Sequence, residues 1–535
     1  MKKFINKIKI STVLLFAVIF NSCDLDINEN PNSATGSVVT PDLTLAAVIA
    51  STVYNQIYYY GYASAAYWAG FQVPGSGIAG FGEQYTYNIT SSSVTGAWTA
   101  IDADLRQYNT IIKKAEADEE YALYGGICHI MKAYCFQLLV DAYADVPYSE
   151  GLQGKEGIYT PAFDKGADVY KALVAEIDEA ISIINANKGN IGVSVKGLNS
   201  TSDPVFSGDM TKWVQFANNL KLRLLVRAEG SEIDAFVKES FGKFSSDGFL
   251  KQDVLVNPGY NATSAQNPYW SVYHSSVTGS QTQAAQYYVP SRYVFSFYNG
   301  TKLLDSIRGK LVYKGYPSTP SGQLGIEVDG DLHPTSNRYA WYVGTGTGTS
   351  ASEAKGIIKS RAAPTPLFTL TETYFLLAEA ALNGHTLDGD AKTNFEKGIE
   401  ASIGYLSISG TGTAYPSTAA ADFAQYKADN ATKYLVNFDL ADTNAKKLEA
   451  IITQKYLALN MINSNEAWNE FRRTAYPTLS GNDDPVYSFV SVQSNSTHHD
   501  RLPVKLVWPQ NEINLNPNVP KDRDPYQDRV FWDKQ

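Results

Sequence analysis

The chain has 535 residues, of which 44% are hydrophobic and 13% aromatic, and its formal net charge is −10. This length suffices for one large domain or for two to three ordinary ones. Its 44 Lys and Arg residues form no basic block of the kind that binds phosphate backbones, so the composition argues against a nucleic-acid partner.

The N-terminus has the segment order of a secretory signal. Four lysines precede an apolar run, residues 10–20, which ends at Ser22 and Cys23. The run is too short to cross a bilayer core, which needs about 20 apolar residues. Ser22-Cys23 resembles a bacterial lipobox, in which the cysteine becomes the acylated N-terminus. We expect a signal peptide over 1–22, lipidation of Cys23 and a flexible leader over 23–40; the alternative is cleavage nearby, with Cys23 as a spare thiol.

Several segments repeat apolar residues at the 3.6-residue period of an amphipathic helix. The stripes predict helices that include residues 45–57, 127–139, 169–184, 213–224 and 448–459. The second of these helices contains Cys128 and Cys135, which are two turns or roughly 10 Å apart, too far for a disulfide. We expect two buried free thiols.

The segment "TLTETYFLLAEAALNG" predicts both ends of a helix. Thr369 followed by Glu372 forms a capping box, and Gly384 supplies a left-handed C-cap. A second helical segment, "GDAKTNFEKGIEASI", follows directly. Two adjacent helices with small residues between them are typical of a tetratricopeptide-like hairpin, although no regular 34-residue period is visible.

Three loop-rich stretches interrupt the helices: residues 61–96, about 253–366, and 476 to the C-terminus. The second is far longer than an ordinary connection and predicts a compact lobe with short strands or a binding surface. The fold class is therefore mainly α, with a helical scaffold and an embedded irregular lobe. We expect residues 41–535 to form a single domain.

Signatures of enzymes are absent from the sequence. No HExxH helix, P-loop or G-x-S-x-G elbow occurs. His498, His499 and Asp500 are interpreted as a solvated loop, and Asp329 and Asp331 lack the spacing of a calcium loop. We predict no metal, no cofactor and no catalysis, although paired carboxylates of a glycosidase need no sequence signature and stay open.

Aromatic residues in loops are the candidate ligand-binding residues. A flat ring can stack on a sugar or pack on a peptide side chain. Trp270 leads because Asn267-Pro268 predicts an extended, turn-like backbone that would hold the indole out. The alternative for each ring is a plug in the core. The candidates are Trp68, Tyr85, Tyr269, Trp270 and Trp341.

Five stretches of the chain resemble the SusD/RagB family, in its branch of SusD-like outer-membrane nutrient-binding lipoproteins. They are "CDLDINENPN", "DAYADVPYSEGLQ", "TETYFLLAEAALNG", "QKYLALNMINSNEAWNEFRRTAYP" and "RLPVKLVWPQNEINLNPN". Ala144 stands where the family has glycine, and Gly151 where it has alanine.

The resemblance implies an α-helical fold with about four degenerate tetratricopeptide-like hairpins, lipid-anchored to the outer membrane and facing the cell exterior. It also implies a partner, a SusC-like TonB-dependent transporter barrel that such proteins cover as a hinged lid. The family does not fix the ligand, so the site residues rest on the aromatic argument alone. We favour a glycan or oligosaccharide ligand; a peptide ligand and a surface hydrolase are the alternatives.

Overall fold

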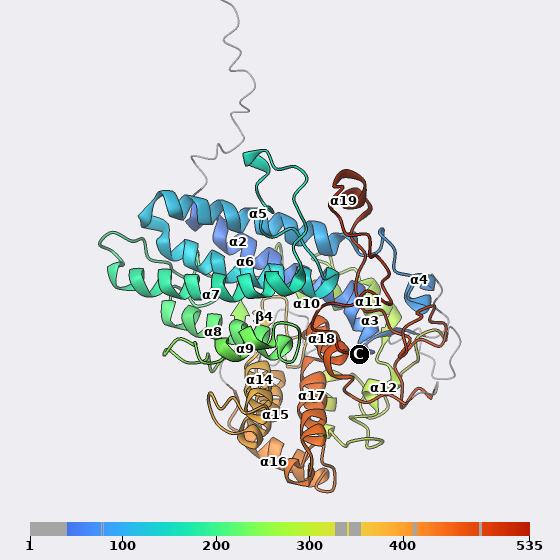
Figure 1. The fold of residues 1–535 in the computed structure, drawn as a ribbon. Coiled ribbons are helices and arrows are strands. Elements are labelled where there is room, and N and C mark those ends of the chain that lie inside the picture. Colours follow the sequence, from blue (N-terminus) through green and yellow to red (C-terminus); the bar gives the residue numbers. More distant parts are fainter. Residues whose placement is uncertain are drawn as a thin grey trace, which may run out of the picture.

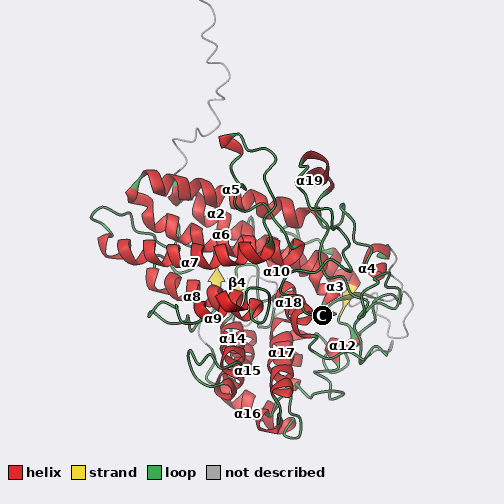
Figure 2. Cartoon of the chain, in the orientation of Figure 1, coloured by secondary structure: helices red, strands yellow, loops and turns green. Residues whose placement is uncertain are grey.

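The computed structural model describes residues 40–75, 78, 80–326, 340–341, 355–409, 415–480 and 484–535. Cys23, the predicted signal and leader up to residue 39, and the pair Asp329 and Asp331 lie outside these residues. Helices dominate the described chain, and strands are few and short (Figure 2). The predicted fold class, mainly α, is confirmed.

The N-terminal half forms a stack of long helices in which each helix packs on the next (Figure 1). The helices confirm the stripes predicted around residues 45–57, 127–139, 169–184 and 213–224. Their bounds are α2 Pro41–Ile57, α5 Thr95–Ala117, α6 Ala122–Tyr143, α7 Gly166–Asn187, α8 Met210–Ala228 and the short α9 Asp234–Ser240.

Helix α6 is the centre of this stack. The segment Glu119–Tyr143 is apolar and long enough to cross a membrane by composition, but 94% of its most apolar window is buried inside the protein. Cys128 and Cys135 are buried in it as free thiols, as predicted. The hydropathy of α6 is thus explained by contacts with α5 and α7 on either side.

A second group of helices lies below the first in the view of Figure 1. In α14, the side chain of Thr369 accepts a hydrogen bond from the Glu372 amide, and Gly384 follows the helix with φ +95°. Both predicted helix ends are confirmed. The group comprises α14 Leu370–Leu382, α15 Ala391–Ser407, α16 Ala419–Asp429, α17 Asn444–Leu459 and α18 Ser464–Thr474.

The three loop-rich stretches contribute short elements to the lobe and its surroundings. Two antiparallel pairs fasten them: β1 pairs with β3 through Val73 and Val289, and β2 pairs with β4 through Val254 and Phe368. The strands are β1 Val73–Pro74, β2 Val254–Val256, β3 Tyr288–Val289 and β4 Thr365–Phe368. The helices are α3 Ala66–Trp68, α4 Gly82–Thr86, α10 Pro268–Tyr273, α11 Gln283–Tyr287, α12 Arg292–Phe295, α13 Ser306–Val312 and α19 Gln510–Leu515.

A buried ion cluster joins the two helical groups. Arg223 of α8 makes a two-pronged pair with Glu372 of α14, at 2.7 and 2.9 Å. Arg227, one turn further along α8, binds Asp141 of α6 at 2.5 Å and Glu466 of α18. The remaining members are Glu379, Lys455, Glu470 and Arg473, which continue the network along α14, α17 and α18.

Electrostatic contacts within the cluster favour the ionised forms of Glu466 and Glu470. Burial alone would raise the pKa of Glu466, but Arg223 and Arg227 outweigh burial and lower it. Asp141, Glu372, Glu379, Glu466 and Glu470 all come from three of the stretches that carry the family resemblance. These motif residues therefore hold the scaffold together and offer no side chain to a ligand.

Candidate functional site

The structure places the five predicted aromatic residues in the core, where none is more than 6% exposed. Trp68 packs against Trp468 with ring centroids 4.6 Å apart, and the Tyr269 hydroxyl donates a hydrogen bond to the carbonyl of Ile462. The prediction that these rings stand out from loops is wrong. Their role in ligand binding stays a prediction. None of the five rings has an exposed face on which a ligand could stack. The five are Trp68, Tyr85, Tyr269, Trp270 and Trp341.

The backbone around Trp270 also differs from the prediction. Asn267 itself is extended, at φ −48° and ψ 132°, but the extended backbone ends there: its side chain caps α10 by accepting from the Tyr269 and Trp270 amides, and Pro268 takes the first helical position. Proline suits that position because the missing N–H has no helical partner there. The helix turns Trp270 inward, where its Nε1 donates to Ser275 Oγ at 3.1 Å and its ring stacks on His274.

A different set of aromatic rings remains accessible, and we call it the tyrosine ladder: Tyr54, Tyr58 and Tyr62. Tyr54 is 39% exposed, and the other two are half-buried. Tyr54 and Tyr58 lie nearly parallel, with centroids 5.6 Å apart and planes 9° apart. The ring centroids of Tyr58 and Tyr62 are 5.5 Å apart. The ladder thus presents a continuous aromatic ridge about three rings long.

A change of helix type keeps the three rings in line. Tyr54 belongs to α2, whereas Tyr58–Ala65 forms a π-helix. In an α-helix, with 3.6 residues per turn, the residue four places on has passed beyond a full turn. A π-helix, with i→i+5 hydrogen bonds, has more residues per turn, so four residues of it complete less than a full turn. The rotation about the helix axis from Tyr54 to Tyr58 is therefore reversed between Tyr58 and Tyr62.

The ladder ends against the lobe. The Tyr62 hydroxyl donates to Oε1 of the exposed Gln283 of α11 at 3.2 Å. The Tyr62 ring also meets the edges of Tyr273 and Tyr288 at 5.7 Å each. Tyr273 in turn contacts Tyr269 and Trp341. Two of the predicted residues therefore lie in the buried aromatic layer behind the accessible one.

The ladder has the chemistry that the aromatic argument requires. Its rings offer accessible apolar surface, its hydroxyls can donate or accept hydrogen bonds, and Gln283 adds an amide. Burial raises the pKa of Tyr62 and that of Tyr54, so both hydroxyls stay neutral at physiological pH. The sequence analysis missed the ladder. The available signal was tyrosine at every fourth position in "YNQIYYYGY", beginning one residue past the stripe residue Val53.

The histidine loop near the C-terminus is less solvated than predicted. His498 is 5% exposed, and its Nδ1 lies 2.7 Å from Asp500 Oδ1, whereas His499 is exposed. Side-chain ligand atoms of the three residues lie within 4.8 Å of one another. The hydrogen bond explains the proximity of His498 and Asp500, and the rings of His498 and His499 are in contact, with centroids 4.3 Å apart.

Comparisons with known proteins agree with the fold. The family model described as "Starch-binding associating with outer membrane" (SusD-like) matches residues 32–275. The model described as "Susd and RagB outer membrane lipoprotein" matches residues 337–533. Together the two models match well over half of the chain. A comparison with curated proteins gives no match.

Solved structures resemble the whole described architecture. A SusD homologue from Bacteroides thetaiotaomicron has a TM-score of 0.67 at 18% identity, with 93% of this chain and 99% of the other covered. A chitin-binding SusD homologue from Flavobacterium johnsoniae has a TM-score of 0.66 at 19% identity, covering 91% and 98%. A SusD homologue from Bacteroides vulgatus has a TM-score of 0.65 at 20% identity, covering 89% and 92%. The chain belongs to the SusD/RagB family of outer-membrane lipoproteins.

Proposed function

We propose that the chain binds a neutral oligosaccharide at the cell surface and delivers it to a SusC-like TonB-dependent transporter. The observation that carries the ligand assignment is the tyrosine ladder, a ridge of accessible rings that ends beside a hydrogen-bonding amide. Sugar rings have apolar faces that stack on aromatic rings and hydroxyls that pair with amides. The transporter partner rests on the family to which the chain belongs.

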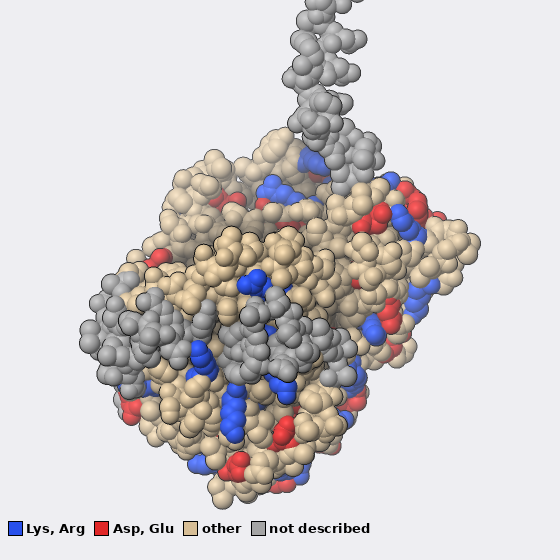
Figure 3. Space-filling model, turned by 180° about the vertical axis from the view of Figure 1, so that it is seen from behind, with Lys and Arg blue, Asp and Glu red and all other residues tan. Residues whose placement is uncertain are grey.

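A glycan is preferred over a peptide for two reasons. Stacking on accessible tyrosine rings suits the apolar face of a sugar, and on the face of the protein shown in Figure 3 Lys and Arg side chains are interspersed with Asp and Glu. Two of the solved structures that resemble the chain are described as chitin-binding. Chito-oligosaccharides are therefore the first ligands to test, followed by other neutral oligosaccharides and by peptides.

We expect Tyr58→Ala to weaken oligosaccharide binding by roughly twofold to tenfold. The substitution removes the middle ring of the ladder, and an aromatic contact contributes about 0.5–1.5 kcal/mol beyond area burial, where about 1.4 kcal/mol is a factor of ten. Isothermal titration calorimetry with the mature chain measures the change. Tyr487→Ala, which removes a tyrosine 49% exposed elsewhere on the surface, is the matched control and should bind like wild type.

Two results would redirect the proposal. Saturable binding of a peptide, with no response to any oligosaccharide, would make the chain a peptide-binding member of the same family. Release of a shorter sugar, detected by chromatography and abolished by substitution of one carboxylate, would make it a surface hydrolase. We expect neither, because Tyr62 of the ladder donates its hydrogen bond to the amide of Gln283 and not to a carboxylate.

The lipid anchor is a separate proposal, motivated by Ser22-Cys23 after the apolar run. We expect mass spectrometry of the mature protein to find an acylated Cys23 at the N-terminus. Cys23→Ala should release the protein from the outer-membrane fraction, because acyl chains supply about 0.8 kcal/mol of membrane affinity per buried CH₂. An unmodified N-terminus at another residue would contradict the anchor and leave the ligand proposal untouched.

A further inference from the structure

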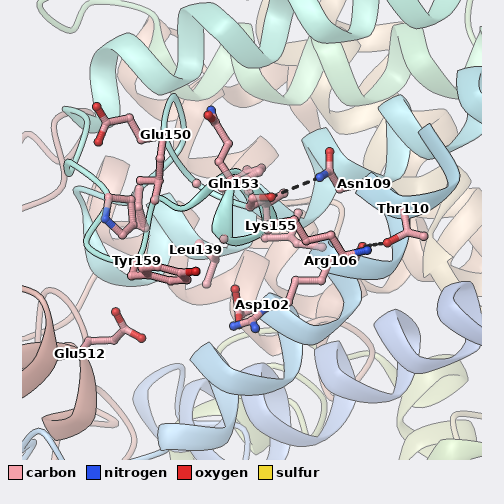
Figure 4. A pocket seen from close by; sticks show the side chains of 18 of the residues that line it. Asp102, Arg106, Asn109, Thr110, Leu139, Glu150, Gln153, Lys155, Tyr159 and Glu512 are labelled. Atoms are coloured by element: carbon pink, nitrogen blue, oxygen red, sulfur yellow. Dashed lines mark hydrogen bonds and ion pairs between the residues drawn. The ribbon is translucent and has the colours of Figure 1, made fainter. Parts of the chain in front are cut away.

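A concave site distinct from the tyrosine ladder lies between α5, α6 and the segment 147–161 (Figure 4). It is a cleft of about 500 Å³, within the roughly 300–1,000 Å³ of small-molecule sites. One face of α5 forms a wall, the segment 147–161 forms the opposite wall, and Glu512 of α19 closes one end. None of its lining residues belongs to the ladder.

The cleft combines an apolar floor with an exposed aromatic ring. Trp98 and Leu139 are almost fully buried and lie at the floor. Tyr159, by contrast, is 82% exposed and stands on the loop side, with Asp102 and Arg106 of α5 opposite it in Figure 4. An aromatic side chain left in water at the mouth of a cleft is a surface that a ligand can cover.

Hydrogen bonds hold the loop wall in place without a ligand. The amides of Tyr148 and Ser149 both donate to Asp164 Oδ2 at 2.8 Å, and the Ala162 amide donates to Glu150 Oε2 at 2.8 Å. On the α5 side, Asn109 Nδ2 donates to the Leu152 carbonyl at 3.5 Å. The cleft is therefore pre-formed, which reduces the entropy cost of binding.

The polar groups of the cleft favour hydroxyl donors. The amide nitrogens of Asn109 and Gln153 donate to backbone carbonyls, as does the Thr110 hydroxyl, so the oxygens of these side chains are left as acceptors. The charges that line the cleft balance in sign, because Asp102, Glu150 and Glu512 face Arg106, Lys113 and Lys155. Of these, Arg106 pairs with Asp102, and Lys113 pairs with Glu156. Acceptors between balanced charges suit a ligand that is neutral and rich in hydroxyl groups.

We infer that this cleft is a second saccharide-binding site, in which Tyr159 stacks on a sugar ring while Asn109, Thr110 and Gln153 accept hydrogen bonds from its hydroxyls. The inference deepens the proposed function and rests on it for the ligand class. A chain with two separated saccharide sites would hold a long glycan at two points. Simultaneous engagement raises the apparent affinity without any new contact, provided that the glycan spans both sites.

The test is calorimetry with chito-oligosaccharides and malto-oligosaccharides on four mature chains: wild type, Tyr159→Ala, the double variant Tyr54→Ala/Tyr58→Ala, and the control Tyr487→Ala. Tyr159 is exposed, so its removal should leave the melting temperature unchanged. We expect Tyr159→Ala to weaken one binding event by roughly twofold to tenfold and to leave the other intact. The double ladder variant Tyr54→Ala/Tyr58→Ala should weaken the other binding event and leave the one at the cleft intact.

The outcomes separate the two sites. A wild-type isotherm for Tyr159→Ala, together with weakened binding in the ladder variant, would overturn the cleft site and leave the ladder standing. A wild-type isotherm for the ladder variant, together with weakened binding in Tyr159→Ala, would support the cleft and overturn the ladder. Failure of every chain to bind either sugar would overturn both.

Discussion

Arg227→Met is expected to lower the free energy of unfolding by about 3–5 kcal/mol, the usual effect of removing one partner from a buried ion pair. Arg227 is 1% exposed and contacts Asp141, Glu466 and Glu470. Without it, Glu466 keeps the ion pair with Arg223, at 3.6 Å, and the more distant charge of Lys455. An uncompensated carboxylate in the core is costly because water cannot solvate it.

Urea unfolding followed by circular dichroism measures this loss. The matched control is Arg106→Met, because Arg106 also pairs with a carboxylate but is 70% exposed in its side chain. Exposed pairs typically contribute about 0–1 kcal/mol, so the control should stay close to wild type. Equal effects of the two substitutions would contradict the assignment of the buried ion cluster as the link between the helical groups.

Trp270→Ala is expected to destabilise the protein by about 3–5 kcal/mol, as large-to-small changes of buried aromatic residues do. The indole is 1% exposed, stacks on His274 at a centroid distance of 4.0 Å, and lies under the guanidinium of Arg361. Its removal would leave a cavity at the base of the lobe and free Ser275 Oγ from its hydrogen bond.

Thermal unfolding of Trp270→Ala and Trp270→Phe on matched preparations tests the packing argument. The phenylalanine variant keeps most of the apolar volume but loses the Nε1 hydrogen bond, so it should lie between wild type and the alanine variant. A melting temperature unchanged by Trp270→Ala would show that the indole does not support the lobe, and would restore the sequence-based interpretation of a projecting ring.

The sequence predicts the helices well because their signals are local. Thr369, Glu372 and Gly384 act within one helix, and the chain around them decides their roles. The apolar stripes of α6 and α7 likewise predict a buried helix face, whichever element packs against it. The helical scaffold could therefore be predicted from the sequence. The family resemblance could also be recognised, because the stretches that carry it contain the residues of the buried ion cluster.

The candidate sites depend on contacts between distant segments, which no local pattern specifies. Tyr269 is buried because the lobe packs on the end of α17, where its hydroxyl reaches Ile462. Glu512 joins the cleft from a segment more than 400 residues after Asp102. The amino-acid composition does not mark the π-helix that aligns the ladder, since Tyr58–Ala65 continues α2 without a break.

The central claim is that the accessible tyrosines bind the ligand while the buried aromatics support the fold. The most direct measurement determines affinity for chito-oligosaccharides and the melting temperature on the same preparations of Tyr58→Ala and Trp270→Ala. We predict that Tyr58→Ala loses roughly twofold to tenfold in affinity with little change in melting temperature. Trp270→Ala should lose several degrees of melting temperature and keep its affinity in the fraction that remains folded. The reverse pattern, with affinity lost in Trp270→Ala and retained in Tyr58→Ala, would contradict the claim.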